Sequence, residues 1–443
     1  MKRNIPETYS LIIIIILILG VASLVIPSGL YERVYDEKTE MTSILPNSYR
    51  QIEKEYLNPF DIAMSIPKGL LQASDIIIFV LVTGGTFGVV NATGLIEKVS
   101  KKSISRYYNK PYLLIALVMI FFSFAGATLG TAEEALPLFP LIISLFVSLG
   151  FNSLVGTGVI LLGAGAGFVA GVFNPFTVGI AHLISELPLF SGLTWRLVAY
   201  ILFTTTAIVY MIYYAKKHRT ISPERMSIQS ESFKTREWLL LMTILLFYVL
   251  LVLGVTMWGF SLPEMITCFG LLAVVTGFLQ GFSASKIVQH FITGASSVLY
   301  GALIIGLARG IYALLESAMI IDTMIYSLTN VLAQLTPKLN ALGMFISHSI
   351  INLFVTSGSG QAALTMPIMS HVADLTDVPR QTAVLAYQFG DGFSNIISPT
   401  SGYFMAALAI GRVSYKKWLK WMLPLFIIWC IEGCIILILS MSL

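Results

Sequence analysis

The sequence predicts an all-α polytopic membrane protein that is built as an inverted repeat with two re-entrant helical hairpins. Its 443 residues are 56% hydrophobic and only 11% charged. Many separate apolar runs reach about 18 residues or more, the length needed to cross the hydrocarbon core of a bilayer. Two of these runs are interrupted by polar, glycine-containing segments that resemble each other. A transmembrane β-barrel would need short strands of alternating hydrophobicity, so that class is excluded.

The first half of the chain is oriented by its charges. Basic residues gather at the start, after residue 97 and in a central loop, and the positive-inside rule places all three segments in the cytoplasm. Acidic residues outnumber basic ones in residues 31–59, so we expect this segment outside. The basic residues are Lys2, Arg3, Lys98, Lys101, Lys102, Arg106, Lys110, Lys216, Lys217, Arg219, Arg225, Lys234 and Arg236.

The order of the first spans requires a hairpin. Residues 9–27 have no cleavage site after them and read as a retained first span that runs outward, and residues 74–94 return. Spans at 154–173 and 193–214 lead back to the central cytoplasmic loop, so residues 111–150 must enter and leave on one side. A re-entrant hairpin with its tip at Gly130 and Thr131 satisfies this requirement, because non-helical backbone is tolerated at that depth when it is buried in protein or lines a wet cavity.

The second half is predicted to repeat the first in the opposite orientation. Spans at 237–257 and 263–281 are followed by a short arm near Lys286 and by a span at 298–318. Residues 339–376 then form a second hairpin that enters from outside, and spans at 381–397 and 418–440 complete the chain. The N-terminus is therefore expected in the cytoplasm and the C-terminus outside. Two opposed hairpins indicate alternating access to one central site.

The interrupted segments are the predicted binding site. Residues 128–136 (TLGTAEEAL) and 356–364 (TSGSGQAAL) can be aligned, and a second break follows each of them at Asn174-Pro175 and Ser398-Pro399. Ends of broken helices expose N–H and C=O groups that can bind a carboxylate or a small cation. The predicted substrate-binding residues are Thr128, Gly130, Thr131, Glu133, Glu134, Asn174, Thr356, Ser357, Gly358, Ser359, Gln361, Asp391, Asn395, Ser398 and Thr400.

Charged side chains at membrane depth are costly and indicate function. Glu133 and Glu134 start a predicted half-helix, whose dipole favours an anion by only about 0.3 to 1 kcal/mol. A cationic substrate or a coupling proton would account for two adjacent carboxylates, and Asp391 has a similar interpretation. Arg309 either pairs with one of these acids or receives a substrate carboxylate. Glu432 remains unassigned.

Other functional classes lack their motifs. Cys268, Cys430 and Cys434 lie in apolar stretches and the five histidines have no ligand spacing, so we expect neither a metal site nor another cofactor. The basic residues lie in loops between spans, which gives no indication of a nucleic-acid partner. We find no nucleophile elbow, zinc helix or phosphate-binding glycine loop, so an enzyme is not expected. A channel would need a continuous pore, which two closed hairpins disfavour.

Four segments of the sequence resemble a known family. They are residues 130–135 (GTAEEA), 174–179 (NPFTVG), 352–367 (NLFVTSGSGQAALTMP) and 388–401 (QFGDGFSNIISPTS). These segments are similar to the YfcC-type proteins, which include arginine/ornithine antiporters and stand near the C4-dicarboxylate anaerobic carriers in the ion transporter superfamily. The resemblance covers nearly the whole chain. It implies a divalent anion:sodium symporter-like elevator fold, in which a fixed scaffold carries a moving transport domain, and a homodimer surrounded by lipid in the bacterial cytoplasmic membrane.

The resemblance divides the chain as follows. Scaffold spans and the outer loop occupy 1–110, the first half of the transport domain 111–192, further scaffold spans and the cytoplasmic loop 193–338, the second half of the transport domain 339–411, and a last scaffold span 412–443.

The hairpin tips bear on the substrate. Carboxylate symporters of the superfamily have tips resembling Ser-Asn-Thr, whereas the corresponding turns here read Gly-Thr-Ala-Glu and Gly-Ser-Gly-Gln. The glutamates favour a basic amino acid, most simply arginine exchanged for ornithine. The alternative is a carboxylate or C4-dicarboxylate carrier coupled to Na⁺ or H⁺.

Overall fold

The computed structural model describes residues 7–36, 41–54, 56–96, 98, 99, 110–130, 133–220, 233–258 and 260–442. The helices in these ranges are α1 (Glu7–Ala22), α2 (Pro59–Gln72), α3 (Ser74–Ala92), α5 (Pro111–Leu129), α6 (Phe139–Ser148), α7 (Ser153–Ala170), α8 (Ile180–Ile184), α9 (Leu193–His218), α10 (Thr235–Trp258), α11 (Leu262–Gln280), α12 (Ala284–Ser317), α13 (Ile321–Leu332), α14 (Pro337–Asn352), α15 (Gly358–Leu375), α16 (Arg380–Asn395), α17 (Gly402–Ile410) and α18 (Tyr415–Ser440). Two short helical turns, η1 (Glu133–Leu138) and η2 (Pro175–Gly179), precede α6 and α8.

Seven helices in the described ranges are long and apolar enough to cross a membrane. They are Ser74–Ala92, Pro111–Thr128, Ser153–Ile184, Leu193–His218, Leu262–Gln280, Ala284–Ser317 and Tyr415–Ser440. The prediction of a helical, multi-span chain is therefore confirmed.

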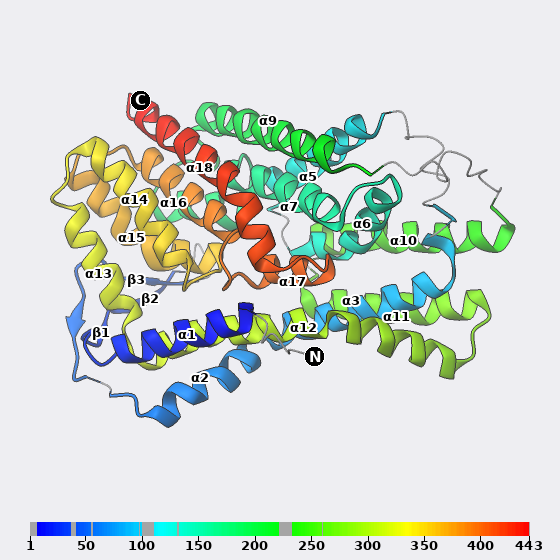
Figure 1. Cartoon of the computed structure of the whole chain (residues 1–443). Coiled ribbons are helices and arrows are strands. Elements are labelled where there is room, and N and C mark those ends of the chain that lie inside the picture. Colours follow the sequence, from blue (N-terminus) through cyan, green and yellow to red (C-terminus); the bar gives the residue numbers. More distant parts are fainter. Residues whose placement is uncertain are drawn as a thin grey trace.

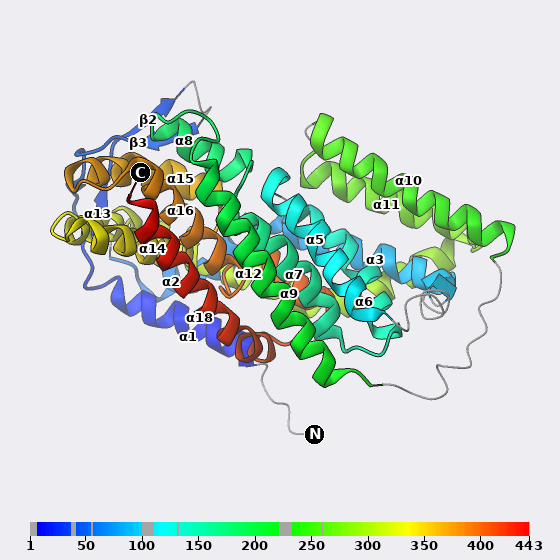
Figure 2. The ribbon, with the colours of Figure 1, turned by 90° about the horizontal axis from the view of Figure 1, so that it is seen from above.

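The helices form two layers (Figure 1). One layer contains α1, α2, α3, α11 and α12, with α10 beside α11 at one end. The other contains α5 to α9 and α14 to α18, and α17 lies where the two layers meet, against α12 and α3. Seen from above, α9 and α18 cover α7 and α16 (Figure 2). We refer to these layers as the α12 layer and the hairpin layer.

The hairpin layer contains one structural order twice. A helical hairpin (α5 with α6, and α14 with α15) is followed by a helix that packs on it (α7, α16), a break, a short helix (α8, α17) and a long outer helix (α9, α18). The first break lies at residues 171–174, directly before Pro175. The second lies at residues 396–401 and contains Pro399. Proline ends a helix because it lacks the N–H group and clashes with the preceding turn.

Small residues allow the first hairpin to approach the helix behind it. A Cβ atom on Gly167 would lie 1.8 Å from the carbonyl oxygen of Ser123, and one on Gly126 would lie 2.3 Å from that of Ala164. Helices in membranes associate through such close backbone contacts because lipid provides no hydrophobic driving force between them. Helix α7 is consequently buried along almost its whole length.

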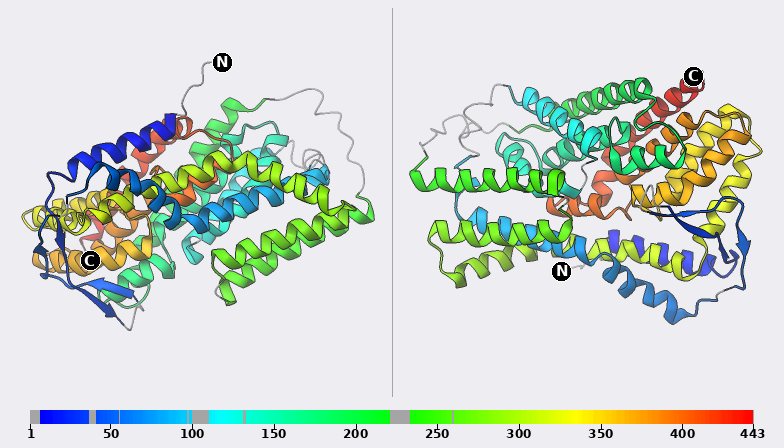
Figure 3. Two further views of the ribbon diagram at one scale, coloured as in Figure 1. Left: turned by 90° about the horizontal axis from the view of Figure 1, so that it is seen from below. Right: turned by 180° about the vertical axis from the view of Figure 1, so that it is seen from behind.

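Glycines also allow α12 to pack closely against α2 and α3. Helix α12 runs antiparallel beside α2 and α3 (Figure 3), since Gly310 meets Gly69 near one end and Gly294 meets Gly84 and Gly88 near the other. Added Cβ atoms on Gly69 and Gly84 would lie 2.2 Å from the amide nitrogen of Gly310 and 2.5 Å from Val298 Cγ2, respectively. Helix α12 therefore packs closely on α2 and α3, with backbone in direct contact at these glycines.

Two local predictions were wrong, and one helix was not predicted. The arm near Lys286 and the span at 298–318 are one continuous helix, α12. The first helix ends at Ala22, so residues 23–27 of the predicted first span lie outside it. Helix α2 was not expected; it starts at a capping box in which the Asn58 side chain accepts from the N–H groups of Phe60 and Asp61.

The segment between α1 and α2 carries two small antiparallel ladders that the all-α prediction did not include. Strand β1 (Gly29–Leu30) pairs with β4 (Arg50–Gln51), and β2 (Arg33–Asp36) pairs with β3 (Met41–Ile44). Arg33 forms an ion pair with Asp322 at 3.0 Å, and the ring of Tyr49 stacks on that of Tyr326. These contacts hold the segment between α1 and α2 against α13.

We predict that Gly69→Ala lowers the thermal unfolding midpoint of the detergent-purified protein, because the new methyl group meets the backbone of α12. Overpacking of this kind costs roughly 1 to 3 kcal/mol. The control is Gly270→Ala in α11, where a Cβ atom meets nothing within 4 Å. Equal midpoints for the two variants would contradict the packing described for α2 and α12.

Candidate functional site

A cavity of about 440 Å³ lies between the two layers and is lined by both. The hairpin layer contributes the two hairpin tips, η2 after the first break, residues of the second break and parts of α7, α16 and α17. The α12 layer contributes the α2–α3 junction and α12. The lining residues are Gln72, Ala73, Ile76, Gly130, Ala164, Gly165, Phe168, Phe176, Thr177, Ile305, Arg309, Thr356, Ser357, Gly358, Ser359, Gly392, Asn395, Ile396, Thr400, Ser401, Gly402 and Tyr403.

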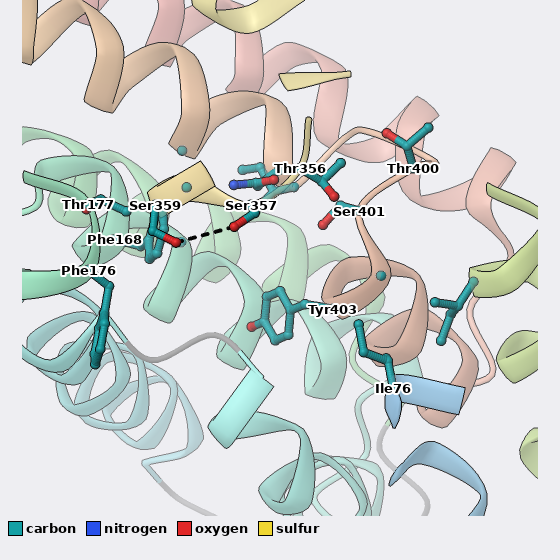
Figure 4. Close-up of a pocket in the computed structure, with 18 of the residues that line it drawn as sticks. Ile76, Phe168, Phe176, Thr177, Thr356, Ser357, Ser359, Thr400, Ser401 and Tyr403 are labelled. Atoms are coloured by element: carbon teal, nitrogen blue, oxygen red, sulfur yellow. Dashed lines mark hydrogen bonds between the residues drawn. The ribbon is translucent and has the colours of Figure 1, made fainter. Parts of the chain in front are cut away.

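The second hairpin tip brings three hydroxyl groups to the cavity. Ser357 caps α15 by accepting from the N–H group of Gly360 at 3.3 Å, and its hydroxyl lies 3.4 Å from that of Ser359 (Figure 4). Thr356 precedes them, and Ser401 and Tyr403 line the same cavity from the second break. Hydroxyl groups both donate and accept, so this wall can bind a carboxylate or a polar cation.

The tip backbone is fixed from behind by α16. The Tyr387 hydroxyl donates to the carbonyl oxygen of Gly358 at 2.6 Å. A Cβ atom on Gly358 would lie 2.7 Å from Thr177 Cγ2 and 3.1 Å from Asp391 Oδ2, so only glycine fits there. The tip of the second hairpin thus packs directly on η2, the turn that follows the first break.

The first hairpin tip turns at Gly130, which has φ +64°. Left-handed backbone favours glycine. Here a side chain would also collide with Asn174, whose Oδ1 would lie 2.6 Å from the added Cβ. Thr131 lies outside the described residues. Glu133 and Glu134 begin η1, and their side chains also lie outside the description.

The breaks are closed by side-chain hydrogen bonds. At the first, Asn174 Oδ1 accepts from the N–H groups of Phe176 and Thr177 at 2.9 and 3.3 Å. At the second, the Thr400 hydroxyl donates to the carbonyl oxygen of Leu353 at 2.6 Å. Free backbone groups away from water are costly, so these bonds stabilise the interrupted helices.

Asp391 is fully buried behind the second tip and does not line the cavity. Its Oδ1 accepts from Asn395 Nδ2 at 3.0 Å, whereas Oδ2 has no hydrogen-bond partner. The buried oxygens Asn352 Oδ1 and Thr177 Oγ1 also have none. A buried carboxylate needs a compensating charge, so this position can hold a proton or a small cation but cannot reach a substrate in the cavity.

Arg309 lines the cavity from α12. Its guanidinium carbon lies 4.5 Å from the centre of the Tyr312 ring, and its buried Nε has no acceptor. Of the two roles predicted for Arg309, pairing with an acid finds no counterpart among the side chains that the structure describes, which do not include those of Glu133 and Glu134.

The structure separates the predicted site residues into groups. Gly130, Thr356, Ser357, Gly358, Ser359, Asn395 and Thr400 line the cavity. Asn174, Gln361, Asp391 and Ser398 are buried behind it. Gln361 donates to the carbonyl oxygen of His348 at 2.9 Å and so joins the arms of the second hairpin, and the Thr128 hydroxyl donates to Phe124 within α5. The prediction missed Gln72, Thr177, Ser401 and Tyr403, although Ser401 ends one of the family segments.

The family follows from comparison with known proteins. The model of the family described as "DcuC: C4-dicarboxylate anaerobic carrier" matches residues 5–442. The chain belongs to the DcuC family. It is therefore a secondary transporter and a multi-pass membrane protein, and not an enzyme, and the resemblance drawn from the sequence is confirmed.

Two curated relatives align with most of this DcuC family member. The protein named "Putative basic amino acid antiporter YfcC" of Escherichia coli (strain K12) is 31% identical over 465 residues, which include 94% of this chain and 92% of that protein. An uncharacterized protein of Haemophilus influenzae (strain ATCC 51907 / DSM 11121 / KW20 / Rd) is 28% identical, with 90% and 82% covered. The crystal structure of the Alcanivorax borkumensis YdaH transporter matches with a TM-score of 0.43 and 16% identity over 99% of this chain and 98% of that chain. We draw no structural or functional conclusion from that low score.

We predict that Gly358→Ala reduces transport by about tenfold or more, because displacing the tip from Thr177 and Asp391 costs roughly 1 to 3 kcal/mol. The control is Gly270→Ala in α11, where an added Cβ atom meets nothing within 4 Å. Uptake into proteoliposomes, normalised to reconstituted protein, measures the effect. Full activity of Gly358→Ala would show that the tip does not depend on this packing.

Proposed function

We propose that the protein is a secondary antiporter of basic amino acids that exchanges arginine for ornithine by an elevator-type alternating-access mechanism. The observation that carries the proposal is the cavity, in which both hairpin tips, η2 and the second break meet a wall formed by the other layer. A substrate placed there contacts backbone ends that only the folded tips bring together. The similarity to a relative named as a basic amino acid antiporter supports the choice of substrate.

The two layers suggest which parts move. In this proposal the hairpin layer is the transport domain, which carries both tips, and the α12 layer is the scaffold. Helices α9 and α18 pack on α7 and α16, so they belong with the transport domain here, whereas the division drawn from the sequence grouped them with the scaffold. The two structurally similar units would enter from opposite sides, with the N-terminus in the cytoplasm of a bacterium and the C-terminus outside.

The tips offer suitable groups for an amino acid. Its carboxylate would lie against the hydroxyl and N–H groups of residues 356–359, and its α-amino group against free carbonyl oxygens of the breaks. Glu133 or Glu134 would receive the side-chain cation. Two carboxylates next to the Gly130 turn are better explained by a cationic ligand than by helix capping alone.

A second candidate has one specific observation in its favour. Among the described residues that line the cavity, Arg309 is the only charged one, and it is positive. A carboxylate or C4-dicarboxylate would complement it without any cationic group. In that case Asp391 is the natural position for a coupling Na⁺ or H⁺, because its buried Oδ2 lacks a partner.

The remaining expectations are proposals of the same kind. A homodimer would be formed through the scaffold, and lipid would contact the apolar side chains exposed on helices such as α10 and α11.

The test is counterflow in proteoliposomes. Vesicles loaded with ornithine should accumulate labelled arginine faster than empty vesicles, and the Glu133→Gln, Glu134→Gln double variant should lose this uptake. If empty vesicles and the double variant take up arginine as fast as loaded wild-type vesicles, the antiport proposal fails. Uptake of malate or succinate that depends on an Na⁺ or H⁺ gradient and ignores arginine would establish the second candidate.

A further inference from the structure

We propose that Arg309 is a carboxylate-binding residue that the scaffold contributes to the substrate site, so that a bound substrate bridges the two layers through its carboxylate. This inference rests on the proposed transport function and deepens it by assigning the anionic end of the substrate. It places a specificity-determining residue outside the hairpins and breaks.

The position of Arg309 is set by helix packing. Its neighbours Gly306 and Gly310 face α2, where added Cβ atoms would lie 2.3 Å from Leu70 Cδ2 and 3.1 Å from the carbonyl oxygen of Ser65. The backbone on both sides of Arg309 is therefore held against α2. Ile305 and Arg309, one turn apart, line the cavity from the α12 layer.

The guanidinium group of Arg309 is oriented by an aromatic ring and has no acidic partner among the side chains that the structure describes. Tyr312, one turn along α12, holds it through a ring contact at 4.5 Å, which is a favourable cation–π distance. Its Nε is shielded from solvent and has no acceptor, and none of the ion pairs between described residues includes it. A cation at membrane depth needs a counter-charge, which an anionic ligand in the cavity would supply.

The opposite wall fits a carboxylate. It presents the hydroxyl groups of Thr356, Ser357 and Ser359 from the hairpin tip, and no described lining residue is acidic. A carboxylate between this wall and Arg309 would accept from hydroxyl groups on one side and from guanidinium N–H groups on the other. Arginine side chains suit this role because their planar fork matches carboxylate geometry.

The proposal has a consequence for exchange. The hydroxyl groups would travel with the transport domain, whereas Arg309 would stay with α12. A substrate with a carboxylate would therefore be held more tightly when the cavity faces Arg309 than after the layers have moved apart. A ligand without a carboxylate would not sense this difference.

The experiment compares arginine with agmatine, which lacks the carboxylate but keeps both nitrogen-containing ends. Inhibition of labelled arginine counterflow is measured for wild type, Arg309→Gln, Arg309→Lys and the control Lys286→Gln, which removes an exposed charge from the same helix. We expect Arg309→Gln to weaken the binding of arginine by about tenfold or more, the loss expected for one charged hydrogen bond. The binding of agmatine should weaken by less than about twofold. Arg309→Lys should give an intermediate value and Lys286→Gln no change.

A second readout covers a variant that no longer transports. The thermal midpoint of each purified variant is measured with arginine and with agmatine, since a ligand that binds the folded state raises it. The proposal would be overturned if Arg309→Gln reduced the rise in thermal midpoint equally for arginine and agmatine, or for neither of them. So would recovery of Arg309→Gln by Glu133→Gln or Glu134→Gln, which would assign Arg309 to an internal ion pair.

Failure of the proposed substrate can be separated from failure of this inference. If wild type exchanges no basic amino acid but binds succinate, the same variants are compared with succinate and its neutral diamide. Loss of succinate binding alone in Arg309→Gln would support the inference even though the basic amino acid proposal had failed. An unchanged succinate midpoint would overturn it.

Discussion

Four interruptions in apolar helices leave backbone N–H and C=O groups that lipid cannot satisfy, and the arrangement of the hairpin layer depends on how these groups find partners. Asn174 caps the turn after the first break, and Ser357 caps α15. At the second break, Tyr415 and Trp418 of α18 donate to the carbonyl oxygens of Ile397 and Ile396, each at 2.9 Å. The outer helix is thus needed to close the break that it covers.

Several side chains behind the cavity support the backbone of the second hairpin. Buried side chains such as Gln361 and Tyr387 bond to backbone inside the hairpin and make it rigid. The hydroxyl groups of the tip line the cavity between the layers, which Arg309 lines from α12. A rigid tip with accessible donors loses little freedom when it binds a ligand, which is the physical advantage of placing the site at a supported break.

The sequence predicted the breaks and tips because proline, glycine and polar residues act locally on the backbone. It could not separate residues that line the cavity from those that support it: Asp391 and Gln361 have the same polar character as Ser357 but lie behind the tip. The sequence did not show that α12 is continuous. Its Gly294 contacts Gly84 and Gly88 of α3, about 200 residues away in sequence, and no local pattern reveals such a packing role. Gln72 reaches the cavity only through the packing of α2 on α12.

The central claim is that substrate is held between two layers that move relative to each other, and a cross-link between the layers tests it most directly. A Cβ atom on Gly402 would lie 3.2 Å from Ile305 Cγ2, so cysteines at these two positions of α17 and α12 can be joined. In a background without Cys268, Cys430 and Cys434, oxidation should abolish counterflow, and reduction should restore it, while the ligand-induced rise in thermal midpoint persists. Full exchange by the cross-linked protein would contradict the account.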